Sequence, residues 1–66
     1  MFEVKISTEG AAFKSESDDA YFNRLATKAE VVFLLRKILE QIKAGYTEHS
    51  VIDENGNKVG EWRLDI

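Results

Sequence analysis

The chain has 66 residues, and a chain of this length buries only about 60% of the surface that its unfolded form exposes, so we expect one domain over residues 1–66 with a single core. It contains no cysteine, which excludes a disulfide framework and thiol catalysis and fits a reducing compartment such as the cytoplasm, while its net charge of −3 disfavours nucleic acid as a partner. No apolar run approaches the roughly 20 residues of a membrane-spanning helix, and the first residues do not resemble a signal peptide, so neither membrane insertion nor secretion is expected.

The N-terminal segment predicts a strand. Phe2, Val4 and Ile6 alternate with polar residues, as in a strand with one buried face, so we expect a strand over residues 2–7. A glycine then interrupts the pattern. Residues 11–13 could extend this strand past a bulge or return beside it as a further strand, and the sequence leaves both alternatives open.

A capping box and a glycine bracket the predicted helix. Thr27 and Glu30 stand three residues apart, so each side chain can bond the other's backbone amide, and Gly45 suits the left-handed conformation that ends many helices. We therefore predict a helix over residues 27–44. The preceding segment, residues 14–26, is predicted to be a surface connector whose apolar spacing allows one short helical turn.

The predicted helix carries a broad apolar stripe that should pack on the sheet, because its apolar side chains fall on one side at about 100° per residue. Phe33 is an exception that points to the polar side. One explanation is that the connector folds back and covers Phe33 with Tyr21 or Phe22. The other is that Phe33 forms a partner-binding patch with Val32 and Arg36. The stripe itself consists of Val31, Leu34, Leu35, Ile38, Leu39 and Ile42.

The C-terminal part predicts a β-hairpin. Two segments with strand-like patterning, residues 48–52 and 58–66, flank an Asn-Gly dipeptide, which tolerates the positive φ values of tight turns. Two registers remain open. A type I′ turn would place His49 opposite Trp62, whereas a type I turn with a glycine bulge would place His49 opposite Glu61.

Together these elements predict an α+β fold of order β-α-β-β. The sheet would be of antiparallel type with three strands, or four if residues 11–13 join it, and one amphipathic helix would cover one face. One helix cannot cover both faces, so the second face must be polar or must meet another molecule. Because so small a chain has little core of its own, a homodimer is one natural form of that contact.

We predict no catalytic, metal or cofactor site. Asp53, Asn55 and Asn57 imitate the start of a calcium-binding loop, but the glycine and the final acid that such a loop requires are missing, so a plain turn is expected. His49 is the only histidine, and its expected role is a cross-strand contact. Trp62 alternates with apolar residues and is expected to be buried, not to stack on nucleic acid.

Several motifs resemble small uncharacterised proteins encoded by bacteriophages and prophages. The shared features are a D-x-N-G-N-x-V-G hairpin at residues 53–60 after a helix that ends at Gly45, an F-x-V-x-I strand at residues 2–6, and the A-A-F of residues 11–13. The resemblance implies this fold and a place in the cytoplasm of a bacterial host cell. It carries over no activity, cofactor or catalytic residue.

The leading hypothesis is a non-enzymatic phage or prophage accessory protein that acts by contact with another protein or with a second copy of itself. An alternative is an acidic inhibitor of a host nucleic-acid enzyme, whose carboxylates would imitate phosphates. Direct binding of nucleic acid is a third hypothesis, which the negative net charge weakens. The candidate acidic surface consists of Glu9, Glu16, Asp18 and Asp19.

Overall fold

The computed structural model describes residues 1–16 and 19–66. In this part of the chain three strands, one long helix and one short 3₁₀ helix follow one another in the order β1 (Phe2–Ile6), η1 (Ala11–Phe13), α1 (Ala20–Lys43), β2 (Glu48–Ile52) and β3 (Lys58–Leu64).

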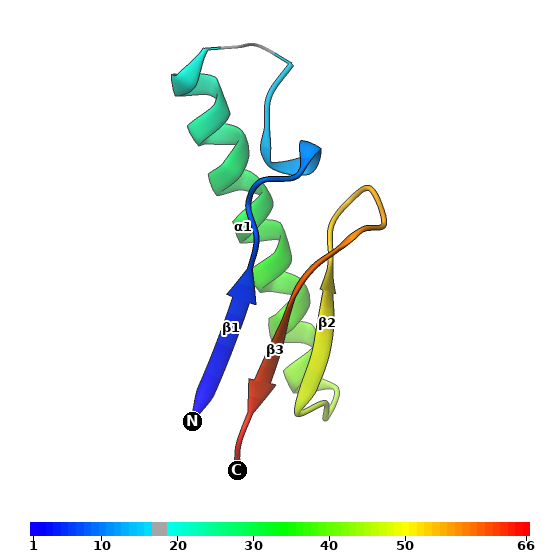
Figure 1. Cartoon of the computed structure of the whole chain (residues 1–66). Helices are drawn as coiled ribbons and strands as arrows, with labels where there is room; N and C mark the ends of the chain where they lie inside the picture. Colours follow the sequence, from blue (N-terminus) through cyan, green and yellow to red (C-terminus); the bar gives the residue numbers. More distant parts are fainter. Residues whose placement is uncertain (17–18) are drawn as a thin grey trace.

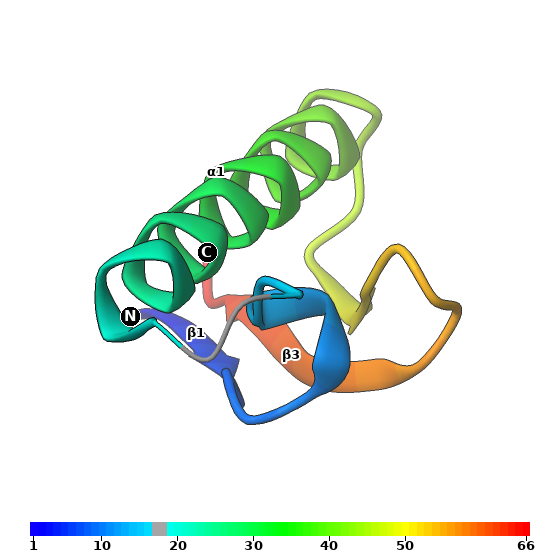
Figure 2. The same cartoon turned by 90° about the horizontal axis from the view of Figure 1, so that it is seen from above.

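The three strands form one antiparallel sheet with α1 across one face (Figures 1 and 2). β3 is the central strand and pairs with β1 on one side and with β2 on the other. The predicted α+β class and the β-α-β-β order are therefore confirmed.

Residues 11–13 adopt neither of the two predicted strand conformations. They form η1, in which the backbone N–H of Phe13 donates to the carbonyl of Gly10 and that of Lys14 donates to the carbonyl of Ala11, both at 3.1 Å. The turn drives the Phe13 side chain into the core, where it is fully buried. Burial of this ring decides the local conformation, and the described sheet stays three-stranded.

The helix begins a full two turns earlier than predicted. Asp19 is its N-cap, and the Asp19 carboxylate accepts a hydrogen bond of 2.8 Å from the backbone N–H of Tyr21. Residues 20–26 are thus helical and do not belong to a connector. The predicted start at Thr27 is wrong.

Thr27 has a different role, although its sequence context imitates a capping box. Its hydroxyl oxygen lies 2.8 Å from the carbonyl oxygen of Phe13 and 2.9 Å from that of Asn23, so its single proton is shared between the two carbonyls. Asn23 Oδ1 in turn accepts from the backbone N–H of Ser15 at 3.0 Å. These side-chain bonds fasten the segment around η1 to the helix, which the capping-box interpretation did not foresee.

The C-terminal end of α1 matches the prediction. Gly45 has a φ of 105°, and its backbone N–H donates to the carbonyl of Ile42, while the N–H of Tyr46 donates to the carbonyl of Gln41, each at 3.1 Å. These bonds satisfy carbonyls that the end of the helix would otherwise leave free. Gly45 as the terminating residue is confirmed.

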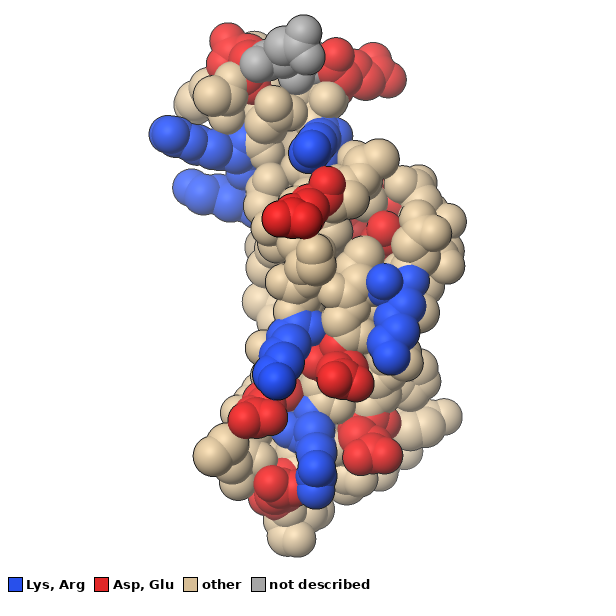
Figure 3. Space-filling view, viewed as in Figure 1, with Lys and Arg blue, Asp and Glu red and all other residues tan. Residues whose placement is uncertain are grey.

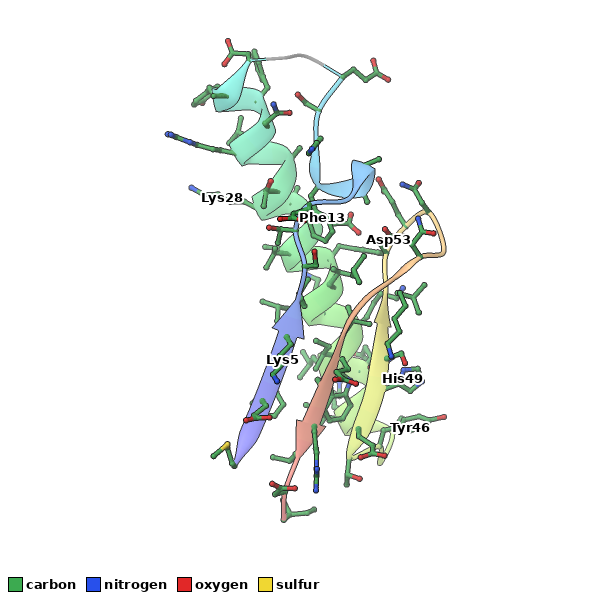
Figure 4. The ribbon with its side chains drawn as sticks, viewed as in Figure 1. Lys5, Phe13, Lys28, Tyr46, His49 and Asp53 are labelled. Atoms are coloured by element: carbon green, nitrogen blue, oxygen red, sulfur yellow. The ribbon has the colours of Figure 1, made fainter. Side chains whose placement is uncertain are left out.

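The core lies between α1, η1 and the sheet. Its fully buried side chains are Trp62 of β3, Phe13 of η1 and Leu34 of α1 (Phe13 is labelled in Figure 4). The indole N–H of Trp62 donates to Gln41 Oε1 at 2.6 Å, so burying this ring leaves no donor unsatisfied. The predicted burial of Trp62 is confirmed.

The apolar stripe predicted for α1 divides between core and surface. Leu34 and Ile38 are buried as predicted, but Leu35 and Leu39 are 46% and 54% exposed, so the expectation that they pack on the sheet is wrong. Two interstrand spacings make this sheet only about 10 Å wide. So narrow a sheet covers one strip of the helix and leaves the neighbouring strip to solvent.

The hairpin combines features of both predicted registers. Gly56 has a φ of 83° and no described residue other than glycine has a positive φ, which excludes a type I′ turn over Asn55 and Gly56. The far ends of the strands nevertheless pair His49 with Trp62, as the type I′ register would. Next to the turn the pairing of Ile52 with Lys58 is shifted by one residue from the type I′ register. A bulge between Val51 and Ile52 removes this shift, so that the rest of the hairpin follows the type I′ register.

Asp53 organises the hairpin loop. This residue, labelled in Figure 4, is buried. Its Oδ1 accepts hydrogen bonds from the backbone N–H groups of Asn55 at 2.9 Å and Asn57 at 2.8 Å. Glu30 of α1 is also buried, and its carboxylate lies 3.4 Å from the backbone N–H of Glu54. The predicted plain turn, with its side-chain bonds to nearby amides, is confirmed.

Replacing Asp53 should show how much this loop contributes to stability. We expect Asp53→Ala to lower the free energy of unfolding by about 1–2 kcal/mol, because two amides lose their acceptor. Asp53→Asn keeps an oxygen at the same place and should cost less than about half of that amount. Urea unfolding followed by the fluorescence of Trp62 measures both variants, and equal losses would show that the two hydrogen bonds are not the cause.

Candidate functional site

The face of the sheet that α1 leaves open is polar. In the register of the sheet Arg63 of β3 lies between Glu3 of β1 and Glu48 of β2, and Glu61 lies between Lys5 and Ser50. Figure 3 shows acidic and basic side chains alternating over this face. A shallow hollow lies among these side chains, but its lining is predominantly polar and carries both signs of charge. The open face therefore needs no second molecule to cover it.

Among the described residues, seven of the eleven exposed large apolar side chains lie on α1. Seven positions of the helix recur at alternating spacings of four and three residues, the arrangement by which two packed helices interlock. The middle of this row is exposed, and Ile42 at its end is partly buried against the core. We call this row the α1 seam, and it consists of Tyr21, Leu25, Lys28, Val32, Leu35, Leu39 and Ile42.

The seam is exposed because the opposite side of α1 is occupied by the hairpin. The Lys37 ammonium donates to the carbonyl of Ile52 at 3.1 Å, and Gln41 and Glu30 also contact residues of the hairpin. At about 100° per residue Leu39 points half a turn away from Glu30. No described residue of the chain therefore covers the middle of the seam.

The predicted patch of Val32, Phe33 and Arg36 exists as a surface. These three side chains, with Lys28 and Ala29, line one shallow depression, which includes the seam residues Lys28 and Val32. Phe33 is 43% exposed, and the Lys37 ammonium lies 5.0 Å from the centre of its ring. The structure therefore brings the three predicted residues together.

The alternative explanation, in which the preceding segment covers Phe33, is wrong. Tyr21 and Phe22 lie in the first turn of α1 and pack on each other with ring centres 5.5 Å apart. Phe22 is eleven residues before Phe33, which places it about 16 Å away along the helix. Neither ring can reach Phe33.

The edges of the α1 seam are basic. Arg24 lies beside the N-terminal half of the seam, and Arg36 and Lys43 lie beside its C-terminal half, while Lys28 lies within the row; all four are exposed. Figure 4 shows Lys28 pointing away from the sheet. The helix has five cations and two acids, a formal charge of +3, although the whole chain carries −3. The charge of the protein is therefore divided, with α1 basic and the remainder acidic.

The candidate acidic surface is only partly described. Glu9 and Glu16 are exposed, and the Asp19 carboxylate caps α1 by accepting from the N–H of Tyr21. Asp18 lies outside the described residues. The capping bond gives Asp19 a structural role that the phosphate-mimic hypothesis did not include.

The remaining candidate positions have structural roles. His49 Nδ1 lies 2.7 Å from the carbonyl oxygen of Ser50, and its ring meets that of Tyr46 edge-on at 5.3 Å. Over residues 1–16 and 19–66 no three histidine, aspartate or glutamate side chains gather closely enough to bind a metal ion. Within the same ranges no helix has the length and apolarity needed to cross a membrane.

Reasoning from the sequence missed most of the seam. Leu35 and Leu39 were expected in the core, and Tyr21 and Leu25 were expected in a connector. The alternating spacing of four and three residues is visible in the sequence once the helix is extended to Ala20. The early helix start was therefore the missing information.

Comparison of the chain with protein-family models, with curated proteins and with solved structures finds no match.

Proposed function

We propose that this chain is a non-enzymatic binding protein that acts by protein–protein contact, and that the α1 seam is the surface that meets the partner. The observation that carries the proposal is the row of half-exposed apolar side chains along one side of α1. Single exposed apolar residues are ordinary, but a row of them, here interrupted only by Lys28, is typical of an interaction surface. The polar open face of the sheet offers no comparable surface.

The size of the apolar row sets a limit on its contribution. Burying the exposed half of a leucine-sized side chain contributes about 1 kcal/mol, so the five exposed apolar residues of the seam offer on the order of 5 kcal/mol. The loss of translational and rotational freedom on association costs at least about 4 kcal/mol. The seam alone would therefore bind weakly, and contacts along its edges must add to it.

The setting that we propose is that of a phage or prophage accessory protein in the cytoplasm of a bacterial host. The motif resemblance of the hairpin and of the first strand supports this setting. A second copy of the chain is one candidate partner, and light scattering tests it directly. A chain that stays monomeric at high micromolar concentration would exclude the homodimer.

A capture experiment with matched variants tests the role of the seam. We expect immobilised wild-type protein to retain a bacterial protein that Leu39→Lys no longer retains, because the charge interrupts the apolar row. Ile66→Lys makes the same change at another exposed aliphatic residue, outside α1, and should retain that protein. Retention of the same proteins by all three forms, or by none of them, would contradict the proposed function.

A further inference from the structure

We propose that the partner of the α1 seam is an acidic amphipathic helix of another protein, and not a second copy of this chain. This inference rests on the proposed function, since it names the kind of partner that the seam would bind. Three features of α1 support it: the spacing of the seam, the charge of its flanks, and a lysine inside the row.

The spacing of the seam favours a helical partner. Its seven positions cover three heptads with no irregular step, from Tyr21 to Ile42. Side chains at this spacing interlock with the same spacing on a second helix, and the row is roughly 32 Å long. A flat protein surface or a lipid surface would require an apolar side of the helix, but it would not require this repeat.

The charge of the flanks selects an acidic partner. In a pair of helices the positions on either side of the seam meet the flanks of the partner. Here these positions include three cations and no acid, so an acidic partner helix would find a complementary charge along its length. The seven flanking positions are Phe22, Arg24, Ala29, Val31, Arg36, Ile38 and Lys43. Ile38 is buried and Val31 is partly buried, so the flanking residues that a partner would meet are the three cations with Phe22 and Ala29.

The same flanks disfavour a second copy of the chain. In a parallel or an antiparallel pair of identical helices, flank faces flank, so cations would meet cations or apolar side chains and never an acid. The lysine within the seam adds to this effect. Lys28 would face Lys28 of the other copy in a parallel pair and an apolar seam residue in an antiparallel pair. An acid at the facing position of a different helix removes that penalty.

The test uses a synthetic peptide of about three heptads with glutamate at its flanking positions and leucine at its seam positions, except for one glutamate at the seam position that faces Lys28. We expect this peptide to bind the intact protein, as measured by fluorescence anisotropy. Its affinity should fall at least about tenfold when NaCl is raised from about 50 mM to about 500 mM. A peptide with lysine in place of each glutamate should not bind. Equal binding of the two peptides would overturn the inference.

Charge-reversal variants separate this inference from the proposed function. We expect the double variant Arg24→Glu with Arg36→Glu to bind the acidic peptide at least about tenfold more weakly. Lys5→Glu with Lys58→Glu makes the same change of net charge on the strands and should bind as the wild type does. If Leu39→Lys abolishes binding while charge reversal on α1 does not weaken it, the acidic partner is wrong and the seam still stands as a docking surface. If none of these variants changes binding, both proposals fail.

Two further measurements distinguish an acidic helix from two other possible partners of the seam, a second copy of the chain and a membrane surface. Sedimentation should show a monomer for the wild type, and a dimer that Leu39→Lys dissociates would overturn the inference in favour of a second copy. Vesicles that contain about half phosphatidylglycerol should not displace the bound peptide from the protein. The inference would be overturned in favour of a membrane surface if the protein binds these vesicles but not the peptide, and if Leu39→Lys abolishes the binding to vesicles.

Discussion

Gly60→Ala should destabilise the chain by about 3 kcal/mol or more, because overpacking against backbone atoms cannot be relieved by turning a side chain. A Cβ atom at this position would overlap the carbonyl oxygen of Lys5 and would lie 2.8 Å from the Lys5 carbonyl carbon and 2.9 Å from Ile6 Cα. All of these atoms belong to the backbone of β1, the strand that pairs with this part of β3. The new methyl group would have to push β1 away from the sheet.

Thermal and urea unfolding measure this loss, which is large compared with the total free energy of unfolding of so small a chain. A chain of 66 residues has a free energy of unfolding of about 3–10 kcal/mol, so much of the variant would be unfolded at room temperature. Gly45→Ala is the matched control, because its φ of 105° is strained for alanine but nothing lies within 4 Å of the new atom. Its expected cost is only about 1–2 kcal/mol. An equal cost at the two glycines would contradict the close approach of β1.

Phe13→Ala should lower the free energy of unfolding by about 3–5 kcal/mol, the usual cost of removing a buried aromatic ring from a core. Phe13 is fully buried between η1 and α1, and it is one of the three largest fully buried side chains of the described chain. Circular dichroism and the fluorescence of the single tryptophan follow unfolding independently. The two signals should show one common transition at a lower denaturant concentration.

Phe13→Leu serves as the control for this prediction. It keeps an apolar side chain of similar reach, and we expect it to cost less than about 2 kcal/mol. A loss of under about 1 kcal/mol for Phe13→Ala would mean that the segment around η1 is not part of the core. In that case the hydrogen bonds that Thr27 and Asn23 make to this segment would have no structural consequence.

The sequence predicted those elements whose signals are local. Alternation placed β1 and the hairpin strands, and Gly45 marked the end of the helix correctly, because each depends on residues next to one another in the chain. The prediction failed where a distant contact decides the conformation. Thr27 begins a sequence that matches a capping box, but its hydroxyl donates to the carbonyl of Phe13, fourteen residues away. The bulge in the hairpin register likewise depends on pairing between strands.

The candidate site was predicted only at its edge. The position of Phe33 on the polar side of the helix indicated an exposed patch with Val32 and Arg36, and these residues do share one surface depression. The sequence could not show that Leu35 and Leu39 remain exposed, because that depends on the width of the sheet beneath the helix. An apolar stripe indicates how much of a helix could be buried, and the width of the element packed against it determines how much is buried.

Chemical-shift mapping by NMR tests the docking role of the seam most directly. When ¹⁵N-labelled protein is titrated with the acidic peptide, we expect the amide signals of Val32, Leu35 and Leu39 to move. Those of Lys5 and Glu61, on the open face of the sheet, should stay in place. Shifts that appear on the sheet face, or no shifts along α1 at saturating peptide, would contradict the assignment of the α1 seam as the surface that binds a partner.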